Sequence, residues 1–546
     1  MHRNKSVSVH QFAMIPKADV PRSSFRIQKS LKTAFDSGYL VPMYCEEVLP
    51  GDTFNLRSTF FARLATPIFP VMDNLHIDTF FFFVPNRLVW NNWVRFMGEQ
   101  DNPDDSISFV IPTVSCPAGG YAVGTLQDYF GLPTAGQITG SNVYSHSALP
   151  LRGYNLIYNE WFRDQNLQDS VVVDKDDGPD LYSDYVLLRR GKRHDYFTGC
   201  LPWPQKGDSV TLPLGVSAPV FGTGKSLGLT DGTNNLGLYA QTSTGNLSGT
   251  TAAYNQNPGT AGVGTGTAVD KALGVVTSGV SGLFADLSEA TAATINQLRQ
   301  SFQIQKLLER DARGGTRYTE IITAHFGVRS PDSRLQRPEY LGGGSSPITV
   351  NPIAQTSGTS ASGTTTPLGN LAAMGTAVAR HGFTQSFVEH GYVIGLMSVR
   401  ADLNYQQGLR RHWSRSTKYD FYWPAFAMLG EQAVLNQEIY TTGTSTDDDV
   451  FGYQERWAEY RYNPSQITGL MRSTSAGTID AWHLAQKFTS LPTLNETFIQ
   501  DTPPVSRILA VGAGANGQQI ILDAFFDCVA ARPLPVYSVP GLIDHF

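Results

Sequence analysis

Residues 76–90, HIDTFFFFVPNRLVW, contain four consecutive phenylalanines (80–83) directly before Val84 and Pro85. A strand with one solvated face alternates apolar and polar residues, so this run predicts a strand that is buried on both faces. Periodicity alone does not separate such a strand from a buried segment of helix. Pro85 and the helical spacing of the apolar residues after it favour a strand that ends at Val84. Each face of the phenylalanine run therefore needs a cover.

The composition favours β structure over long helices. The chain of 546 residues carries 52 Gly and 31 Pro, and both residue types interrupt helices. Charged residues make up 16% of the chain and aromatic residues 11%, whereas a typical soluble protein has about 25% charged residues. A surface so poor in charge suits contact with other proteins, although large β proteins often share this composition.

Many short strand-like segments with long connections predict a mainly β fold, an antiparallel sandwich or jelly roll with a few short helices. We expect strands within 39–84, 186–197, 390–403, 418–429 and 507–535, and helices at 86–98, 151–165 and 291–315. Along the chain we expect a basic arm at 1–40, the first part of the body with inserted helices and loops at 41–220, a Gly/Thr-rich insertion at 221–290, and the remainder of the body at 291–546 with a low-complexity loop at 342–370.

The charge is unevenly distributed. The formal net charge is −6, so the chain as a whole is not a basic nucleic-acid binder. Residues 1–32 nevertheless hold seven cations and one acid, Asp19. A basic arm on an acidic body is a candidate contact for phosphates. The arm cations that we consider candidates to face a nucleic acid are Arg3, Lys5, Arg22, Arg26, Lys29 and Lys32.

A second basic run lies in strand-like sequence with aromatic residues nearby. It consists of Arg189, Arg190, Lys192 and Arg193, close to Tyr196. Such a run could contact phosphates while the aromatic rings stack on bases. The alternative, which we favour slightly, is a solvated edge strand whose positive charge discourages unwanted pairing.

Cysteine spacing and hydropathy argue against several other classes of protein. The four cysteines lie far apart without a CxxC pair, which predicts neither a zinc site nor a disulfide framework but free thiols in a reducing cytosol. The N-terminus lacks the apolar core of a signal peptide. No window approaches 18 uninterrupted apolar residues, so we expect no membrane span. The cysteines are Cys45, Cys116, Cys200 and Cys528.

Four short motifs resemble functional sites without the required context. Ser226 lies in a GxSxG pentapeptide (224–228) that also resembles a phosphate loop, but the segment is Gly-rich and no helix follows. The GxGxxG at 512–517 is followed by strand-like sequence and suits a hairpin better than a dinucleotide site. DKDDGPD (174–180) and the acids at 447–449 suit solvated turns better than weak calcium sites. We therefore predict no catalytic, cofactor or metal site.

Long segments of the chain resemble the major capsid protein of the Microviridae, the small single-stranded DNA phages, and their gokushovirus branch in particular. The matching segments run from near the first residue to the last. They are PRSSF (21–25), GYLVPMYCEEVLPGDTFNL (38–56), FARLATPIFPVMDNLHIDTFFFFVPNRLVWNNWVRFMGE (61–99), PQKGDSV (204–210), LLERDARGGTRYTEIITAHFGVRSPDSRLQRPEYLGG (307–343) and VYSVPGLIDHF (536–546).

The resemblance implies an eight-stranded jelly roll, and sixty copies in a T=1 icosahedral shell around a circular single-stranded DNA genome. It also implies a virion that contains a minor pilot-type protein and a small basic DNA-binding protein and that assembles in the bacterial cytoplasm. In this branch an insertion forms a protrusion at each three-fold axis and is thought to meet the host receptor. The segment 221–290 matches that insertion in position and composition only.

Two other functions are alternatives to that of a capsid protein. One is a lectin-like adhesin with a jelly-roll fold, and the other is an enzyme with Ser226 as nucleophile. In a capsid subunit, several parts of the protein can bury the two faces of the phenylalanine run. We expect alternate rings to fill the sandwich core and the others to pack under the helix at 86–98, under an inserted loop or against a neighbouring subunit. The chain's own helices and loops are the cover that we favour.

Overall fold

The computed structural model describes residues 22–208 except 107, and residues 210, 295–314, 320, 324–325, 336–354, 356, 371–510 and 518–537, together with the backbone of four short strands between 220 and 285. The chain divides into two compact units. The first unit comprises Met1–Pro204 and Gly314–Phe546, and the second comprises Gln205–Arg313. Each unit is described by itself below.

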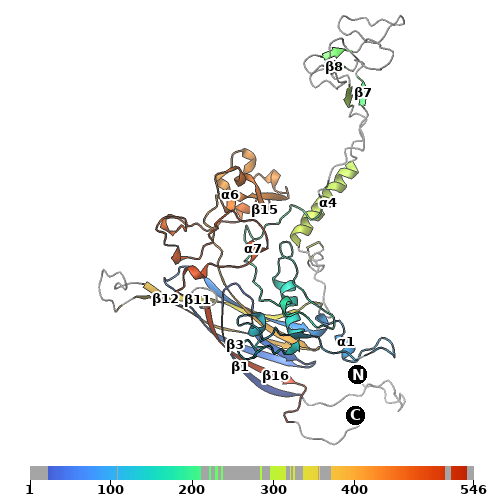
Figure 1. The fold of residues 1–546 in the computed structure, drawn as a ribbon. Helices are drawn as coiled ribbons and strands as arrows, with labels where there is room; N and C mark the ends of the chain where they lie inside the picture. Colours follow the sequence, from blue (N-terminus) through green and yellow to red (C-terminus); the bar gives the residue numbers. More distant parts are fainter. Residues whose placement is uncertain are drawn as a thin grey trace, which may run out of the picture. The chain divides into compact units, whose positions relative to one another are not determined.

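The first unit is built on eight long antiparallel strands (Figure 1). Neighbouring strands follow the order β1-β16-β3-β12-β11-β4-β13-β2. Their bounds are β1 (Ser23–Phe35), β2 (Val41–Val48), β3 (Thr53–Leu64), β4 (Leu75–Pro85), β11 (Glu339–Ala354), β12 (Leu371–Ser386), β13 (Gly391–Ala401) and β16 (Ile520–Arg532).

The pairing of these strands is nested along the chain. The first long strand pairs with the eighth, the second with the seventh, the third with the sixth and the fourth with the fifth. Two four-stranded sheets result, β1-β16-β3-β12 and β2-β13-β4-β11, joined where the end of β11 (349–354) pairs with β12. This is the connectivity of a jelly roll, so the predicted fold class is confirmed. The last strand, β16, lies between β1 and β3.

The two sheets enclose an apolar core that the strands fill by strict alternation. In β3 the side chains of Phe54, Leu56 and Phe60 are buried, while the odd-numbered residues of the strand face outward. Phe81 and Phe83 of β4 belong to the same core. Because successive side chains point to opposite faces of a strand, the other two phenylalanines of the run lie on the outer side of their sheet.

The outer phenylalanines are covered by the chain's own helix. Phe82 is 1% exposed, and its ring centroid lies 5.5 Å from that of Trp161 and 5.9 Å from that of Phe162. Phe80 packs edge-to-face on Phe162 at 5.2 Å. The cover is the predicted helix at 151–165, observed as α3 (Leu149–Ile157) continued by η2 (Tyr158–Phe162). The favoured source of the cover is therefore confirmed.

The helix predicted at 86–98 is wrong as one element. The segment forms two short turns, η1 (Asn86–Leu88) and α1 (Trp93–Phe96). The physical reason is a competing hydrogen bond, since the backbone N–H of Asn91 donates to the carbonyl of Lys175 at 2.9 Å instead of to its own helix. The apolar residues still contribute to the second core, where Trp90 is fully buried.

Two predicted strands are absent from the described residues. The segment 186–197 makes only isolated bridges, between Tyr39 and Arg189 and between Gly191 and Gln500. The segment 418–429 forms the turns η5 (Lys418–Asp420) and η6 (Pro424–Phe426), because the Asp420 carboxylate accepts N–H groups of the preceding residues and a proline starts the second turn. Strand-like residues there do not meet a partner strand.

Conversely, two segments expected to be irregular are strands. Residues 23–35, within the expected arm, form β1, and residues 342–354, within the expected loop, belong to β11. The glycines that suggested a loop serve close packing between strands. A Cβ at Gly343 would lie 2.0 Å from the carbonyl oxygen of Thr79, and one at Gly344 would lie 2.5 Å from the His381 ring. The rest of 342–370, apart from 356, lies outside the described residues.

Shorter helices, turns and strands lie in the segments that connect the long strands of the first unit. Two of them form a small sheet with a third apolar cluster around Phe197 and Phe451. The remaining elements are β5 (Thr113–Ser115), paired with β6 (Ser145–Ser147); β14 (Glu431–Leu435), paired with β15 (Val450–Glu455); the helices α2 (Leu126–Tyr129), α6 (Asn436–Ile439) and α7 (Glu496–Ile499); and the turns η3 (Tyr182–Asp184), η4 (Arg411–Trp413), η7 (Ser445–Asp448), η8 (Ala458–Tyr460), η9 (Gly469–Met471), η10 (Asp480–Trp482) and η11 (Val505–Arg507).

The second unit contains the helix predicted at 291–315, observed as α4 (Ile295–Gly314). Two pairs of short strands are also described: β7 (Val220–Gly222) with β10 (Leu283–Ala285), and β8 (Gly228–Thr230) with β9 (Asn235–Gly237). Most of the expected insertion at 221–290 lies outside the described residues, as do Ser226 and the glycine motif at 512–517.

Candidate nucleic-acid interface

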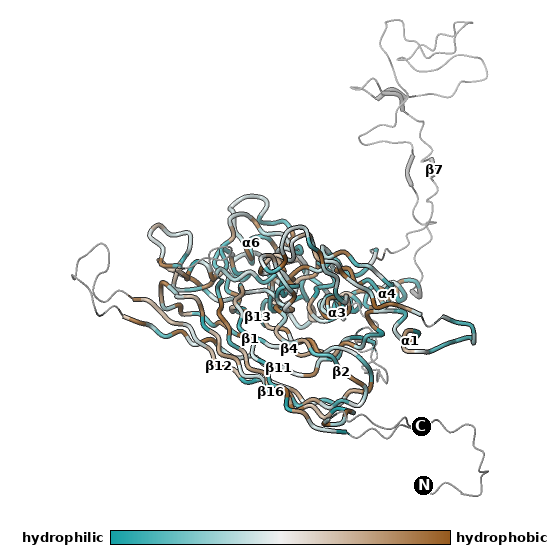
Figure 2. Tube along the Cα trace, turned by 60° about the horizontal axis from the view of Figure 1, so that its bottom comes forward, coloured by the Kyte–Doolittle hydropathy of each residue, from teal (hydrophilic) through white to brown (hydrophobic). Residues whose placement is uncertain are grey.

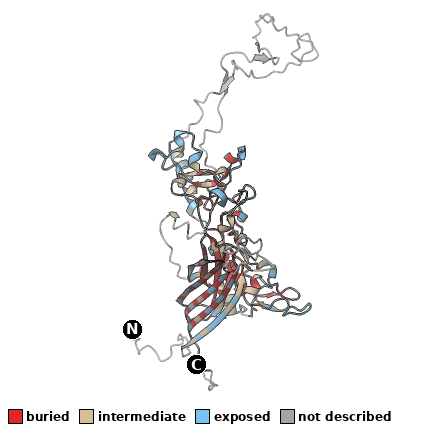
Figure 3. Cartoon of the chain, turned by 90° about the vertical axis from the view of Figure 1, so that its left-hand side faces the viewer, coloured by how far each residue is buried: buried red, intermediate tan, exposed pale blue. Residues whose placement is uncertain are grey.

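The outer face of the β1-β16-β3-β12 sheet carries cations and exposed aromatic rings. Alternation points the even-numbered residues of β1 and β12 and the odd-numbered residues of β3 and β16 outward, and Figure 3 shows exposed residues alternating with buried ones on the long strands. Phe61 and Phe525 lie on this face and are 51% and 43% exposed. The outward cations are Arg26, Lys32, Arg57, Arg63 and Arg380.

Two acids on the central strand neutralise part of this charge. Arg26 makes a bidentate pair with Asp527, with both N–O distances 2.8 Å, and Lys32 reaches Asp523 at 2.8 Å. Within the part of the chain that the structure describes, Arg57, Arg63 and Arg380 make no ion pair. The face therefore has a net positive charge on a chain whose formal charge is −6.

A shallow groove of about 550 Å³ crosses the middle of this face. Arg57 and Arg380 line it together with the Phe525 ring. Gly382 also lines the groove, and a Cβ at this residue would lie 2.1 Å from the carbonyl oxygen of Leu56, so no larger residue fits there. Guanidinium groups beside an exposed ring can hold phosphates and stack on a base.

The remaining arm candidates lie near the same face or outside the described residues. Arg22 donates to the hydroxyl of Thr53 at the start of β3, and the ammonium group of Lys29 lies 5.9 Å from the centroid of the Tyr44 ring. Arg3 and Lys5 lie outside the described residues. The structure thus places three of the predicted arm cations, at 22, 26 and 32, beside or on the charged face.

The second basic run has partners inside the protein. Arg190 pairs with the buried Asp78 at 2.5 Å, and its guanidinium lies over the Phe80 ring. Arg189 stacks on the ring of Tyr39 at 3.9 Å, and Arg193 reaches Asp402 at 3.1 Å. The run therefore ties loops to the body and offers little free charge to a nucleic acid.

Lys192, the fourth cation of that run, is buried beside Asp501. Its ammonium group lies 4.3 Å from the centroid of the Phe498 ring. Burial lowers the pKa of Lys192 to about 8 and raises the pKa of Asp501 to about 6, although their mutual attraction opposes both shifts. Burial shifts both of these pKa values in the direction of the uncharged forms. This pair belongs to the interior rather than to an accessible binding surface.

The acidic segment 174–180 surrounds a buried arginine rather than a metal. Arg152 is fully buried, and its guanidinium donates to both carboxylate oxygens of Asp180 at 2.7 and 2.5 Å and to the carbonyl oxygen of Asp176 at 2.9 Å. Asp177 accepts hydrogen bonds from Trp90 and Asn92. Among the described residues no cluster of three or more His, Cys, Asp or Glu side chains is arranged to hold a metal ion.

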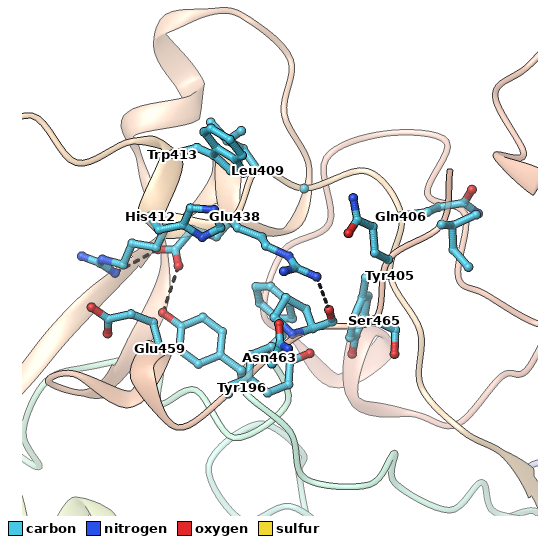
Figure 4. A pocket seen from close by; sticks show the side chains of 18 of the residues that line it. Tyr196, Tyr405, Gln406, Leu409, His412, Trp413, Glu438, Glu459, Asn463 and Ser465 are labelled. Atoms are coloured by element: carbon cyan, nitrogen blue, oxygen red, sulfur yellow. Dashed lines mark hydrogen bonds and ion pairs between the residues drawn. The ribbon is translucent and has the colours of Figure 1, made fainter. Parts of the chain in front are cut away.

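A hollow near the small β14-β15 sheet is lined by aromatic and charged side chains (Figure 4). Its volume is about 510 Å³. At its floor the Tyr196 hydroxyl donates to Glu438 at 2.9 Å, and Arg411 pairs with the same carboxylate at 2.9 Å. Burial raises the pKa of Glu438, although Arg411 opposes the shift. These three groups satisfy one another and form the polar floor of the hollow.

Some residues of the charged face were missed at the sequence level, namely Arg57, Phe61, Arg63, Arg380 and Phe525. The signal for three of them is present in the sequence. Once Phe54, Leu56 and Phe60 are assigned to the core, alternation places the odd-numbered residues of β3 outward. Which other strands complete the face depends on pairings between residues hundreds of positions apart.

The chain belongs to the capsid protein (F protein) family, whose model matches residues 13–542. It is similar to three proteins named capsid protein VP1, each aligned over 98% of this chain and 98% of the relative: those of Bdellovibrio phage phiMH2K (48% identical), Chlamydia phage 1 (43%) and Spiroplasma virus 4 (38%). The predicted resemblance to gokushovirus capsid proteins of the Microviridae is confirmed. The protein is thus a structural component of a virion, which implies a role other than catalysis.

Within the described residues, none of the helices has both the length and the apolar character that crossing a membrane requires.

Proposed function

We propose that sixty copies of this chain form a T=1 icosahedral shell around a circular single-stranded DNA genome, and that the outer face of the β1-β16-β3-β12 sheet lines the inside of that shell. The observation that carries the orientation is the unpaired positive charge of Arg57, Arg63 and Arg380 beside two exposed phenylalanines. The other surface cations described above are mostly paired inside the protein.

The proposal extends to the other components of the virion. The insertion at 221–290 contacts a receptor on the bacterial host, and a minor pilot-type protein and a small basic DNA-binding protein complete the particle, which assembles in the host cytoplasm. The small basic protein shares the neutralisation of the genome. This sharing agrees with a charged face on which, among the described residues, three cations make no ion pair, and with a chain whose net charge is −6.

Particle size tests the shell, and salt dependence tests the face. Purified wild-type chain should form closed particles visible by negative-stain microscopy, whereas a monomer or small oligomer would contradict the shell and favour an adhesin. Neutralising Arg57, Arg63 and Arg380 together to Gln should weaken binding of single-stranded DNA. Because each lost phosphate contact removes about 0.7 from the slope of log affinity against log salt, the slope should fall by about 2.

A matched variant controls for net charge. It neutralises three exposed cations that lie outside this sheet, at Lys175, Arg461 and Lys487. The control should keep the wild-type slope, and both variants should keep the wild-type unfolding midpoint. Equal slopes for the two variants would show that the face is not the DNA surface, without affecting the conclusion about the shell.

A further inference from the structure

One segment of the first unit exposes an unusual density of large apolar side chains. Between β13 and β14, the exposed fraction is 72% for Trp413, 51% for Trp423 and 96% for Met428. We call this set the aromatic surface, and its members are Trp413, Tyr419, Phe421, Tyr422, Trp423 and Met428. Exposed large apolar side chains gathered in one segment at this density mark contact sites on soluble proteins.

The aromatic surface is held in place by the small β14-β15 sheet. The indole N–H of Trp457 donates to the carbonyl oxygen of Phe426 at 2.9 Å, and the Tyr422 and Trp457 ring centroids lie 5.6 Å apart. The guanidinium of Arg415 lies 4.5 Å from the centroid of the Tyr460 ring and pairs with Glu459. These contacts fix the backbone while the outer faces of the rings stay exposed, so a partner would meet a preformed surface.

The aromatic surface is also positively charged. Residues 410–429 contain four cations and a single acid, Asp420. Two of these cations, Arg411 and Arg415, pair with Glu438 and Glu459, so the free positive charge is small. Lys418, at the centre of the segment, is exposed and makes no ion pair within the described residues. Its ammonium group lies 5.0 Å from the Tyr419 centroid. A partner for this surface should therefore combine acidic and apolar side chains.

The same chain carries such a segment in the loop that follows α1, residues 97–105, which we call the acidic loop. It contains four acids and no lysine or arginine, and Met97 at its start is 47% exposed. The loop has a defined shape, because the Asp105 carboxylate accepts the backbone N–H groups of Asp101 and Asn102 at 3.1 and 2.9 Å. Figure 2 shows it as a hydrophilic projection next to α1.

Within one copy the two surfaces do not meet. The aromatic surface packs on the β14-β15 sheet, close to α6, and both Figure 1 and Figure 2 show α1 well separated from α6. Complementary surfaces at separate places on one molecule join head to tail between copies, and such contacts close into rings when the rotation permits.

We propose that the acidic loop of one copy docks on the aromatic surface of the next copy in the shell. The proposal rests on the proposed self-assembly and names the surfaces that make one of its contacts. Apolar contact between Met97 and the exposed rings supplies the buried centre, and Asp104 faces Lys418 at the rim. Asp101 already pairs with Arg95 at 3.3 Å within its own copy. The arrangement is heterologous, so each copy uses both surfaces.

Cross-linking tests the contact directly. Three of the native cysteines are buried, and burial raises the pKa of the fourth, the half-buried Cys45, to about 12, so the native thiols react little. Particles of a chain with both Asp104→Cys and Met428→Cys should give a ladder of covalent oligomers with a short bismaleimide. Particles of either single variant should release only monomeric chains on a denaturing gel. The reason is that a head-to-tail contact does not bring two copies of the same site together.

A second variant measures the energetic role of the surface. Trp423→Ala should reduce the fraction of chain found in particles by about tenfold or more, since buried tryptophans are frequent hot spots of interfaces. Leu181→Ala, an exposed apolar residue outside both surfaces, is the control and should assemble normally. Circular dichroism should show both variants folded like the wild type.

The outcomes separate this inference from the shell itself. Wild-type particles together with no ladder, or with normal assembly of Trp423→Ala, would overturn the docking proposal and leave the shell intact. Particles of Trp423→Ala that form normally but no longer attach to host cells would assign the surface to a receptor, which also overturns it. A wild-type chain that forms no particles would contradict both the shell and the docking proposal.

Discussion

The sharpest prediction concerns Phe81 and Phe82, which are neighbours in sequence but lie in different cores. Both side chains are essentially unexposed. Phe81 packs against Phe383 with a centroid distance of 5.4 Å, inside the sandwich, and Phe82 packs against Phe162 at 5.9 Å, under the helical cover. Replacing either residue by Ala should lower the free energy of unfolding by about 3–5 kcal/mol, the usual cost of the cavity that a buried phenylalanine leaves.

Double substitutions distinguish the two cores. Because Phe81 and Phe82 point to opposite faces and share no partner among the ring pairs, their effects should add to within about 0.5 kcal/mol. Phe82→Ala and Phe162→Ala should instead be coupled by about 0.5–1.5 kcal/mol, since each removes one ring of the same edge-to-face pair. The contrast depends on which residues share a face, and not on their distance in the sequence.

Urea unfolding of the purified chain, followed by tryptophan fluorescence, measures these differences, provided that the slope with denaturant stays constant across the variants. Phe80→Ala is the control, because this ring is only half-buried and should cost less. A coupling between Phe81 and Phe82 larger than that between Phe82 and Phe162 would refute the assignment of the run to two separate covers.

Two further predictions concern one buried and one half-buried polar group, and both are measured by the same unfolding assay. Arg152→Met should cost about 3–5 kcal/mol because it leaves the Asp180 carboxylate buried without its cation, whereas Arg152→Met combined with Asp180→Leu should recover much of the loss; equal costs for the single and double variants would contradict this account. Burial lowers the pKa of His381 below its ordinary value, so its contribution to stability is complete above about pH 6.5 and is lost as the pH falls through the lower folded pKa. His381→Gln, which cannot take up a proton, should make stability depend less on pH below 6.5, and an unchanged pH profile would show that this histidine is not responsible.

The sequence was sufficient to predict features that depend on neighbouring residues. The burial of both faces of the phenylalanine run and the helices at 151–165 and 291–315 follow from local spacing and were confirmed, while β4 ends one residue later than predicted, at Pro85. The jelly roll itself was reached through the resemblance, and the observed nesting of the strands agrees with it.

Features that depend on distant partners could not be predicted. Residues 186–197 look like a strand but make only isolated bridges in the described part of the chain, and three glycines in β11 look like a loop until the close approach of β4 and β12 explains them. The charged face could not be predicted for the same reason. Arg26 was identified as a cation, but its neutralisation by Asp527, 501 positions later, depends on the pairing of the first and last strands.

The position of β16 between β1 and β3 also has a kinetic consequence. During synthesis β1 leaves the ribosome early, but β16, the strand with which it pairs, ends at Arg532. At about 5–20 residues per second, β1 remains without its partner for roughly 25–100 s, and the edge of β3 that will receive β16 is open for almost as long. Unpaired strand edges invite association with other chains. The sheet that carries the charged face is therefore completed only after β16, and so nearly the whole chain, has been synthesised.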